Sequence, residues 1–347
     1  MRHVLRASVG LVGFMGAEAS FACVPSSDDD RLPTYDELPF RPGAPAGSCW
    51  GLWGDDDRLG CLNLLTAERV AAAAGGVRRG AVFALNLEYE LPDPPLFRRQ
   101  APTHEVLGDG GHDDVLTFNT QSSSQWDGFR HIRSHHGYYN GIADADHGID
   151  HWAARGLAGR AVLVDVGRWR VAEGRPLDCG DADPISPEDL DATLSSQGSV
   201  LEIGDILLLR TGWTTWYRSL DEAARRDLPA HLRSPGLRPG TDMLRWLWDH
   251  HIAAIGADNP ALEVWPMGFG RTPEEIVKLR NDPERAPELF LHFALLPLLG
   301  IPIGELWDLD ALAEDCADDG IYEGLFTSAP LRVRSGVASP PNAIVLK

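Results

Sequence analysis

Short apolar runs alternate with amphipathic segments along most of this chain. Runs rich in Val, Ile and Leu are typical of buried strands, whereas apolar residues spaced three and four apart indicate helices that bury one face. Strands are predicted at 81–91, 161–169, 203–210 and 252–257, and again towards the chain end. Helices are predicted at 66–77, at 184–197, from 241 onwards, and on both sides of a glycine break and short strand within 288–317. This alternation predicts the α/β class with one main domain.

Capping residues mark the start of two of these helices. Thr66 is suited to N-cap the first helix, although Arg69 stands where a capping box has glutamate. Ser186 and Pro187 open the helix at 184–197. The strand at 203–210 ends at Arg210, and the carboxyl end of a strand is a usual place for a site in an α/β sheet.

The composition adds a strong acidic balance. Against 31 Lys and Arg residues the chain has 51 Asp and Glu residues, a formal net charge of −20. Nucleic acid and anionic membranes repel such a surface, so neither is expected as a partner. No uninterrupted apolar run reaches the roughly 18 residues that a membrane-spanning helix needs.

The first 32 residues differ from the rest of the chain. Arg2 and Arg6 precede a short apolar patch, as in a weak secretory signal, but Glu18 follows closely. An acidic, proline-bounded linker at 24–33 comes next, so we predict a leader at 1–32 and a single domain at 33–347. The five cysteines are widely spaced without a CxxC pair, which favours reduced thiols and a cytoplasmic protein, with export as the alternative.

The densest group of polar candidates lies in NTQSSSQWDGFRHIRSHHGYYNG, residues 119–141. Asp127 offers a hard oxygen ligand, and His131 offers a nitrogen ligand or a proton carrier that titrates near neutrality. Far along the chain, His292 and Glu305 stand among apolar residues, and each needs a partner if it is buried. A shared cation would satisfy both. The alternative is a hydrogen-bonded core histidine with a locally paired glutamate.

Other residues of this stretch allow both a functional and a structural interpretation. Gln121 and Gln125 alone resemble ordinary polar loop residues, and Tyr139 with Asn140 lines a pocket or makes a turn. The adjacent His135 and His136 are expected at the surface. The chain has no GxSxG, P-loop or dinucleotide-binding motif, so serine hydrolases, nucleotide hydrolases and dinucleotide enzymes lack their signatures.

The order of motifs resembles the cyclase-like metal-dependent hydrolases, the family of bacterial kynurenine formamidase and isatin hydrolase. Their pattern H-x-G-T-H-x-D-x-P-x-H is matched here only at Asp127 and His131. Glutamine replaces two histidines, at 121 and 125, and phenylalanine replaces the proline at 129. DILLLRTGW at 205–213 and HFALLPLLGIPIGEL at 292–306 are similar to two further family motifs, and the resemblance covers about Leu32 to the end. These replacements indicate a divergent branch of that family.

The resemblance implies a mixed β-sheet with flanking helices, a small-molecule substrate and a homodimer. It also implies one divalent ion (Zn²⁺, Mn²⁺ or Mg²⁺) held by Asp127, His292 and Glu305, with His131 as acid and base. The two glutamines would then orient substrate or water. For the substrate pocket we further expect Trp126, Arg130, Tyr139, Asn140 and Arg210.

Three hypotheses about function follow. The first is a metal-dependent hydrolase of an amide, formamide or lactone bond, such as an arylformamidase-like enzyme or a lactonase. The second is a metal-independent cyclase or lactonase that uses Asp127 and His131 as a dyad. The third is a non-catalytic relative that only binds a small molecule. Retention of Asp127, His131, His292 and Glu305 argues against the third.

Overall fold

The structure, a computed structural model, describes residues 31–347. Within it, Pro33–Lys347 forms one compact unit. The signal-like leader and most of the linker predicted at 24–33 lie outside the described residues. In the part of the chain that the structure covers, no helix is both long and apolar enough to cross a membrane.

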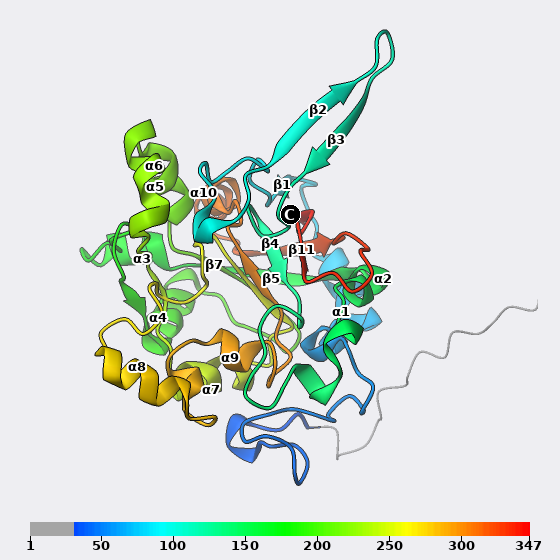
Figure 1. Ribbon diagram of the computed structural model, residues 1–347, viewed down its shortest axis with the longest axis vertical. Helices are drawn as coiled ribbons and strands as arrows, with labels where there is room; N and C mark the ends of the chain where they lie inside the picture. The colour runs from blue at the N-terminus through cyan, green and yellow to red at the C-terminus, as the bar shows by residue number, and fades with distance from the viewer. Residues whose placement is uncertain (1–30) are drawn as a thin grey trace, which may run out of the picture. The chain divides into compact units, whose positions relative to one another are not determined.

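A mixed sheet forms the centre of this unit (Figure 1). Its four middle strands are parallel and the strands on either side are antiparallel, which confirms the mixed α/β sheet. In spatial order the strands are β1 (Val82–Ala84), β13 (Ala343–Leu346), β11 (Glu323–Ser328), β5 (Leu157–Asp165), β7 (Ile206–Arg210), β9 (Ala254–Ala257), β10 (Ile303–Glu305), β4 (Gln125–Asp127) and β12 (Ala338–Ser339). Two small sheets pair β2 (Thr103–Leu107) with β3 (Asp113–Thr117), and β6 (Pro184–Ile185) with β8 (Gly236–Leu237).

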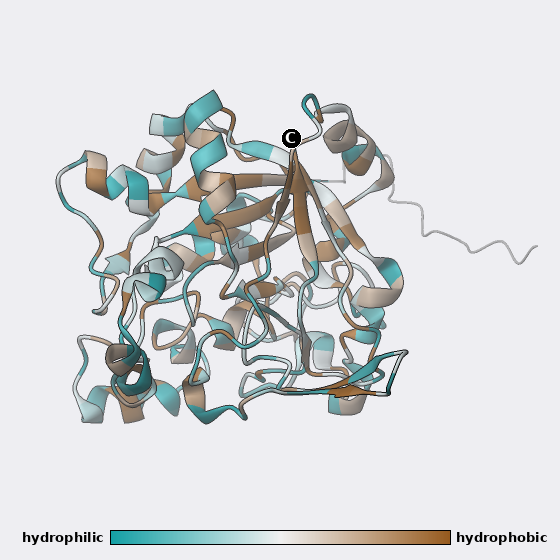
Figure 2. Cartoon of the chain, turned by 90° about the horizontal axis from the view of Figure 1, so that it is seen from above, coloured by the Kyte–Doolittle hydropathy of each residue, from teal (hydrophilic) through white to brown (hydrophobic). Residues whose placement is uncertain are grey.

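Helices flank the sheet, and Figure 2 shows apolar strands at the centre with more polar helices around them. The α-helices are α1 (Ala67–Gly75), α2 (Asp150–Arg155), α3 (Val166–Ala172), α4 (Pro187–Gln197), α5 (Trp213–Ser219), α6 (Glu222–His231), α7 (Thr241–Asp249), α8 (Pro273–Arg280), α9 (His292–Leu295) and α10 (Asp310–Asp319). Short 3₁₀ turns are η1 (Tyr35–Glu37), η2 (Gly60–Leu64), η3 (Leu96–Arg98), η4 (Tyr139–Gly141), η5 (Asp144–Asp146) and η6 (Ala286–Glu288).

The capping residues act as predicted at α1 and α4. The Thr66 side chain accepts from the Arg69 backbone N–H, and Ser186 forms a full capping box with Asp189. Each of the four bounded strand predictions extends beyond the observed strand. The strands predicted at 203–210 and 252–257 begin only at Ile206 and Ala254. The predicted strand at 161–169 ends at Asp165, whose side chain caps α3, and only Val82–Ala84 of 81–91 pairs in the sheet. In both cases a local cap or turn ended a run that looked continuous by hydrophobicity alone.

The pairing of β10 with β4 joins two distant parts of the chain. Glu305 lies opposite Gln125, and Ile303 lies opposite Asp127. Because side chains alternate along a strand, Gln125 and Asp127 share one face of β4 and Trp126 takes the other. Register therefore decides which of these residues can reach a common site.

Trp307 fixes this part of the sheet from the apolar face. Its indole N–H donates to the Gln125 carbonyl at 2.9 Å, and its ring lies on Gly256 and Gly304. A Cβ at either glycine would stand 2.6 or 2.5 Å from the indole, so only glycine allows the ring to lie flat there. The short strand β10 thus has the Trp307 ring against it in addition to its pairing with β9 and β4.

The cysteines of the described chain are free. Cys49, Cys61 and Cys316 are buried and Cys179 is half-buried. Burial raises the pKa of the Cys316 thiol to about 11, despite the nearby Lys347 ammonium. These side chains pack as apolar groups, as their spacing in the sequence indicates.

Candidate metal centre

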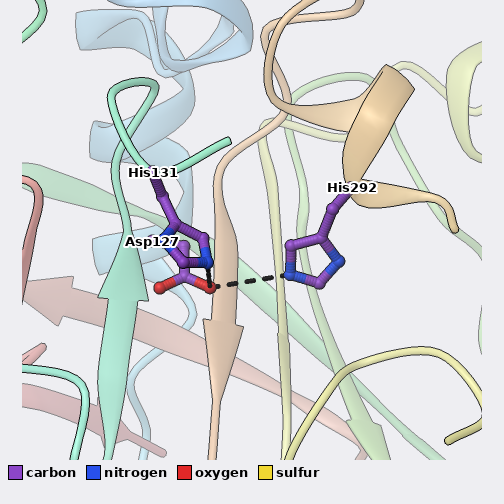
Figure 3. A group of neighbouring side chains, drawn as sticks. All are labelled: Asp127, His131 and His292. Atoms are coloured by element: carbon purple, nitrogen blue, oxygen red, sulfur yellow. Dashed lines mark ion pairs between the residues drawn. The ribbon is translucent and has the colours of Figure 1, made fainter. Parts of the chain in front are cut away.

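Asp127, at the end of β4, lies at the centre of a cluster of histidine and carboxylate side chains (Figure 3). Its side chain is fully buried. Oδ2 has no hydrogen-bond partner in the described structure, yet His292 Nε2 is 3.6 Å from it and His131 Nε2 is 3.8 Å from it. Ligand atoms of these three residues lie within 4.8 Å of one another. A buried carboxylate oxygen without a donor is costly unless something else occupies the space before it.

His292, the first residue of α9, is oriented by a carboxylate behind it. Its Nδ1 lies 2.9 Å from Glu263 Oε1, and its backbone N–H donates to the same oxygen at 3.2 Å. With the Nδ1 proton donated to Glu263, the Nε2 lone pair faces Asp127 and Glu305. This arrangement is typical of histidines that bind metals, because the second carboxylate fixes the tautomer and raises the basicity of the ligand.

Glu305, at the end of β10, closes the cluster from the neighbouring strand. Oε1 lies 3.3 Å from His292 Nε2, and Oε2 accepts from Gln125 Nε2 at 2.6 Å. Gln121 Nε2 donates to Asp127 Oδ1 at 2.6 Å and lies 3.1 Å from His131 Nδ1. Both glutamines thus present amide N–H groups to carboxylates, which leaves Asp127 Oδ2 as the open oxygen.

The cluster shifts the pKa values of its members strongly. Burial alone would raise the pKa of Asp127, but the charges of His131 and His292 outweigh it and lower that pKa to about 2. Burial, together with the Asp127 charge, raises the pKa of Glu305 to about 7. For His292, burial favours the neutral ring, but Glu263, Asp127 and Glu305 prevail and raise its pKa well above the usual value. Burial lowers the pKa of His131.

The donor set fits a divalent cation. Three buried carboxyl groups, on Asp127, Glu263 and Glu305, lie around the His292 ring, and those of Asp127 and Glu305 face its Nε2. Carboxylate oxygens combined with one or two imidazole nitrogens suit Zn²⁺ and Mn²⁺. A set made mostly of oxygen ligands suits Mg²⁺. A cation before Asp127 Oδ2 would supply the missing partner of that oxygen.

Three residues expected in the substrate pocket are buried and bonded elsewhere. Trp126 lies on the opposite face of β4, where its indole N–H donates to Ser328 Oγ at 2.9 Å and its ring packs against Trp307. The Tyr139 hydroxyl donates to Asp57 at 3.0 Å, and the Asn140 side chain holds the turn at 51–55. The alternation of β4 and the turn at η4 explain this placement, and these contacts support packing roles.

The two candidate arginines are engaged in ion pairs. Arg130 pairs with Asp144 at 2.8 Å and donates to the Ser335 carbonyl. Arg210 pairs with Asp165 at 3.1 Å and with Asp310 at 2.8 Å. In both cases the ion pairs join segments of the fold to one another. The exposed His135 bonds the Arg280 carbonyl, so it stays at the surface as expected.

Sequence reasoning missed two residues of the centre, Glu263 and Arg99. Glu263 is fully buried in the apolar run PALEVWP, and a charge in such a run is a signal that could have revealed it. Arg99 lies in an irregular segment, and its Nη1 donates to Gln125 Oε1 at 3.2 Å. No periodic pattern marks Arg99, because its position follows from the turn at η3.

Comparison with protein families matches residues 54–264 to the family described as "Putative cyclase". A crystal structure described as a novel cyclase is similar with 32% identity and a TM-score of 0.74, over 86% of this chain and 97% of that one. A comparison with curated proteins gives no significant match.

More distant structures share the fold. Isatin hydrolase A from Labrenzia aggregata, bound to benzyl benzoate, is 19% identical with a TM-score of 0.52, over 79% of this chain and 96% of that one. An isatin hydrolase bound to the product analogue thioisatinate is 17% identical with a TM-score of 0.51, over 81% of this chain and 99% of that one. At these identities the likeness concerns the fold.

Proposed function

The chain belongs to this cyclase family, and we propose that it is a metal-dependent hydrolase of an amide, formamide, ester or lactone bond in a small molecule. The observation that carries the proposal is the buried Asp127 Oδ2, which lacks a hydrogen-bond partner in the described structure and faces two imidazole nitrogens. Structural metal-free carboxylates are normally saturated with donors.

We assign the ion to Asp127, His292 and Glu305. Glu263 supports this set by fixing the tautomer of His292. When bound there, a divalent ion supplies Lewis-acid polarisation of a carbonyl oxygen and acidifies a water molecule. The two glutamine amides hold Asp127 Oδ1 and Glu305 Oε2, so each carboxylate keeps its other oxygen for the ion.

His131 is the proposed proton carrier. Its side chain is 22% exposed, whereas those of Asp127, His292 and Glu305 are almost completely buried. Because burial lowers its pKa, the ring is neutral at neutral pH and can accept a proton from the attacking water. The same ring then returns the proton to the departing nitrogen or oxygen.

The fold neighbours guide the choice of test substrates. One isatin hydrolase was solved with benzyl benzoate, an aromatic ester, and another with an analogue of its ring-opened product. We therefore propose aromatic formamides, esters and lactones as the first panel.

The roles of His131 and Glu305 can be separated by experiment. We expect His131→Gln to keep the metal but lose turnover by about 10²-fold or more, as for a lost acid–base group. Glu305→Gln should lose metal affinity first and regain part of its turnover at high metal concentration. Metal content by mass spectrometry and turnover on the panel measure both. Full activity of Asp127→Ala and His131→Ala would rule out the mechanism.

The metal-independent dyad is the second candidate. Its supporting observation is the proximity of Asp127 and His131, but 3.8 Å is longer than a hydrogen bond. Turnover that persists after exhaustive chelation would favour it.

The homodimer and the cytoplasmic location remain predictions. Light scattering of the purified protein measures the oligomeric state.

A further inference from the structure

Arg99 lies beside the metal centre and is held there from two sides. Its Nη1 donates to the Gln121 carbonyl and to Gln125 Oε1, the latter at 3.2 Å. Its guanidinium also lies over the Phe97 ring, 4.9 Å from the ring centroid. The contacts recorded for it within the described chain thus use Nη1 and the ring face, which leaves the Nε and Nη2 N–H groups for another acceptor.

A row of aromatic rings connects Arg99 to the opposite side of the centre. The Phe97 and Trp265 rings meet edge to face at 5.1 Å, and Trp265 contacts Phe290 at 6.3 Å. Phe290 in turn stacks on the His292 ring at 4.4 Å with an interplanar angle of 7°. Phe97 and Trp265 are only half-buried, so part of each ring is available to a planar ligand.

The other residues that surround the centre are polar. Gln121 links the Arg99 side of the centre to Asp127 and His131, and the His131 and His292 rings are 6.1 Å apart. The centre is therefore bordered by rings on one side and by Arg99 with the glutamines on another.

Electrostatics makes Arg99 distinctive among these neighbours. The carboxyl groups of Asp127, Glu263 and Glu305 repel any anion that approaches the centre. The positive charge of Arg99 acts on Asp127, His131 and Glu305 alike. An anionic substrate group could approach this acidic cluster only where such a charge is fixed in place, and a guanidinium offers paired N–H donors to a carboxylate.

We propose that Arg99 is a specificity-determining residue that binds the carboxylate of an aromatic substrate whose ring lies against Phe97 and Trp265. This inference rests on the proposed hydrolase function, since the carbonyl to be hydrolysed would then lie over Asp127, His131 and His292. Arg99 binds the substrate, and the cluster performs the chemistry.

A matched pair of substrates tests the proposal. Formanilides with a ring carboxylate or a ring carboxamide differ in charge but hardly in shape. For Arg99→Met we expect the KM for the carboxylate to rise about tenfold or more, as for a lost charge-assisted hydrogen bond, while the carboxamide is nearly unaffected. Arg98→Met is the control, because it removes the same charge from the exposed neighbouring residue.

A binding measurement keeps this test separate from the hydrolase proposal. Calorimetry with benzoate and benzamide on the metal-loaded protein should show benzoate binding that weakens in Arg99→Met, is partly kept in Arg99→Lys, and is unchanged in Arg98→Met. Benzoate affinity that Arg99→Met leaves intact, or equal losses for both ligands, would overturn the assignment. If no formamide, ester or lactone of the aromatic panel is hydrolysed but benzoate binding follows Arg99, the hydrolase proposal fails and the anion site stands.

Discussion

Two buried aspartates, Asp127 and Asp258, illustrate how a site differs from a structural contact. Both are fully buried and both follow or end a strand of the same sheet. Asp258 accepts from the Thr211 backbone and hydroxyl at 2.7 and 2.8 Å and from the Gly212 N–H at 2.8 Å. Asp127 keeps one oxygen without a donor in the described structure. Burial raises the pKa of Asp258 to about 6, whereas the two histidines lower that of Asp127 to about 2.

The difference lies in the partners rather than in the residue type. Around Asp258, backbone N–H groups are fixed donors that satisfy the carboxylate within the fold. Around Asp127, the imidazole nitrogens and the second carboxylate are groups of the kind that bind cations, and the proposed ion would satisfy them together. The oxygens of Asp258 are used up by fixed donors of the fold, whereas Asp127 keeps an open oxygen among groups of the kind that bind cations.

The largest expected effect is on activity. Asp127→Asn should lower kcat/KM by about 10³-fold or more, because it removes the charge shared by the proposed metal and the proton carrier. A chelator should lower the free energy of unfolding of the wild type and leave that of the variant unchanged, because only the wild type keeps the carboxylate that holds the proposed ion. Turnover on the aromatic panel and urea titration measure the two quantities. An equal effect of the chelator on both proteins would remove Asp127 from the metal centre.

Metal affinity should respond next. Glu263→Gln should weaken divalent-ion binding about 10- to 100-fold, because the amide no longer fixes and polarises the His292 ring. Competition with a chromogenic chelator measures the affinity. Glu284→Gln, which changes the same residue type at an exposed position outside the centre, is the control. Equal affinity in all three proteins would remove Glu263 from the centre.

Stability should reveal the role of Asp258. Asp258→Asn places an amide N–H group against the backbone donors of Thr211 or Gly212, and an unsatisfied buried donor costs about 1–3 kcal/mol. Urea titration should therefore show a lower free energy of unfolding at unchanged metal affinity. The comparison between the two aspartates breaks down if this variant loses the metal but not stability.

The smallest expected effect concerns His147 and the pH dependence of stability. Its Nδ1 is also buried without a partner in the described residues, but its neighbours are packed aromatic rings rather than ligands. Burial lowers its pKa to about 4, below the usual value of about 6.5 in the unfolded chain. Only the unfolded state therefore gains a proton between these values as the pH falls. Stability should drop by about 1.4 kcal/mol from pH 7.5 to 5.5 through this residue alone.

The measurement is the pH dependence of urea unfolding in the wild type and in His147→Gln. The variant should lack this part of the slope over the same interval, while any slope from other groups remains. Identical slopes in the two proteins would mean that His147 is protonated in the folded state. An unsatisfied atom alone does not make a site, and His147 shows what is missing: neighbouring ligand atoms.

The sequence predicted the sheet better than the surroundings of the site. Short continuous apolar runs identified the strands around Leu207 and Ile255, and the caps at Thr66 and Ser186 were visible locally. The alternation of strand β4 could have separated Trp126 from Asp127, had that short strand been recognised. It has only three residues, too few to show periodicity.

The sequence predicted only part of the candidate cluster, because irregular segments again show no periodic pattern. Asp127, His131, His292 and Glu305 do lie together, although their roles remain proposals. Arg99 and Glu263 were missed because their positions depend on irregular turns and on packing between distant segments. Tyr139, Asn140 and Arg210 have polar side chains whose partners only the three-dimensional structure identifies.

The insertion of β10 between β9 and β4 has a consequence for folding. Glu305 and Gln125 are separated by 180 residues, so their pairing closes a very long loop. Such closure costs chain entropy before any contact compensates it, and it is slow compared with the formation of local helices. The ligand cluster therefore cannot exist in a partly folded chain. An emerging polypeptide presents these acidic and imidazole groups separately, and capture of the proposed cation at this place would mark a chain that has completed its fold.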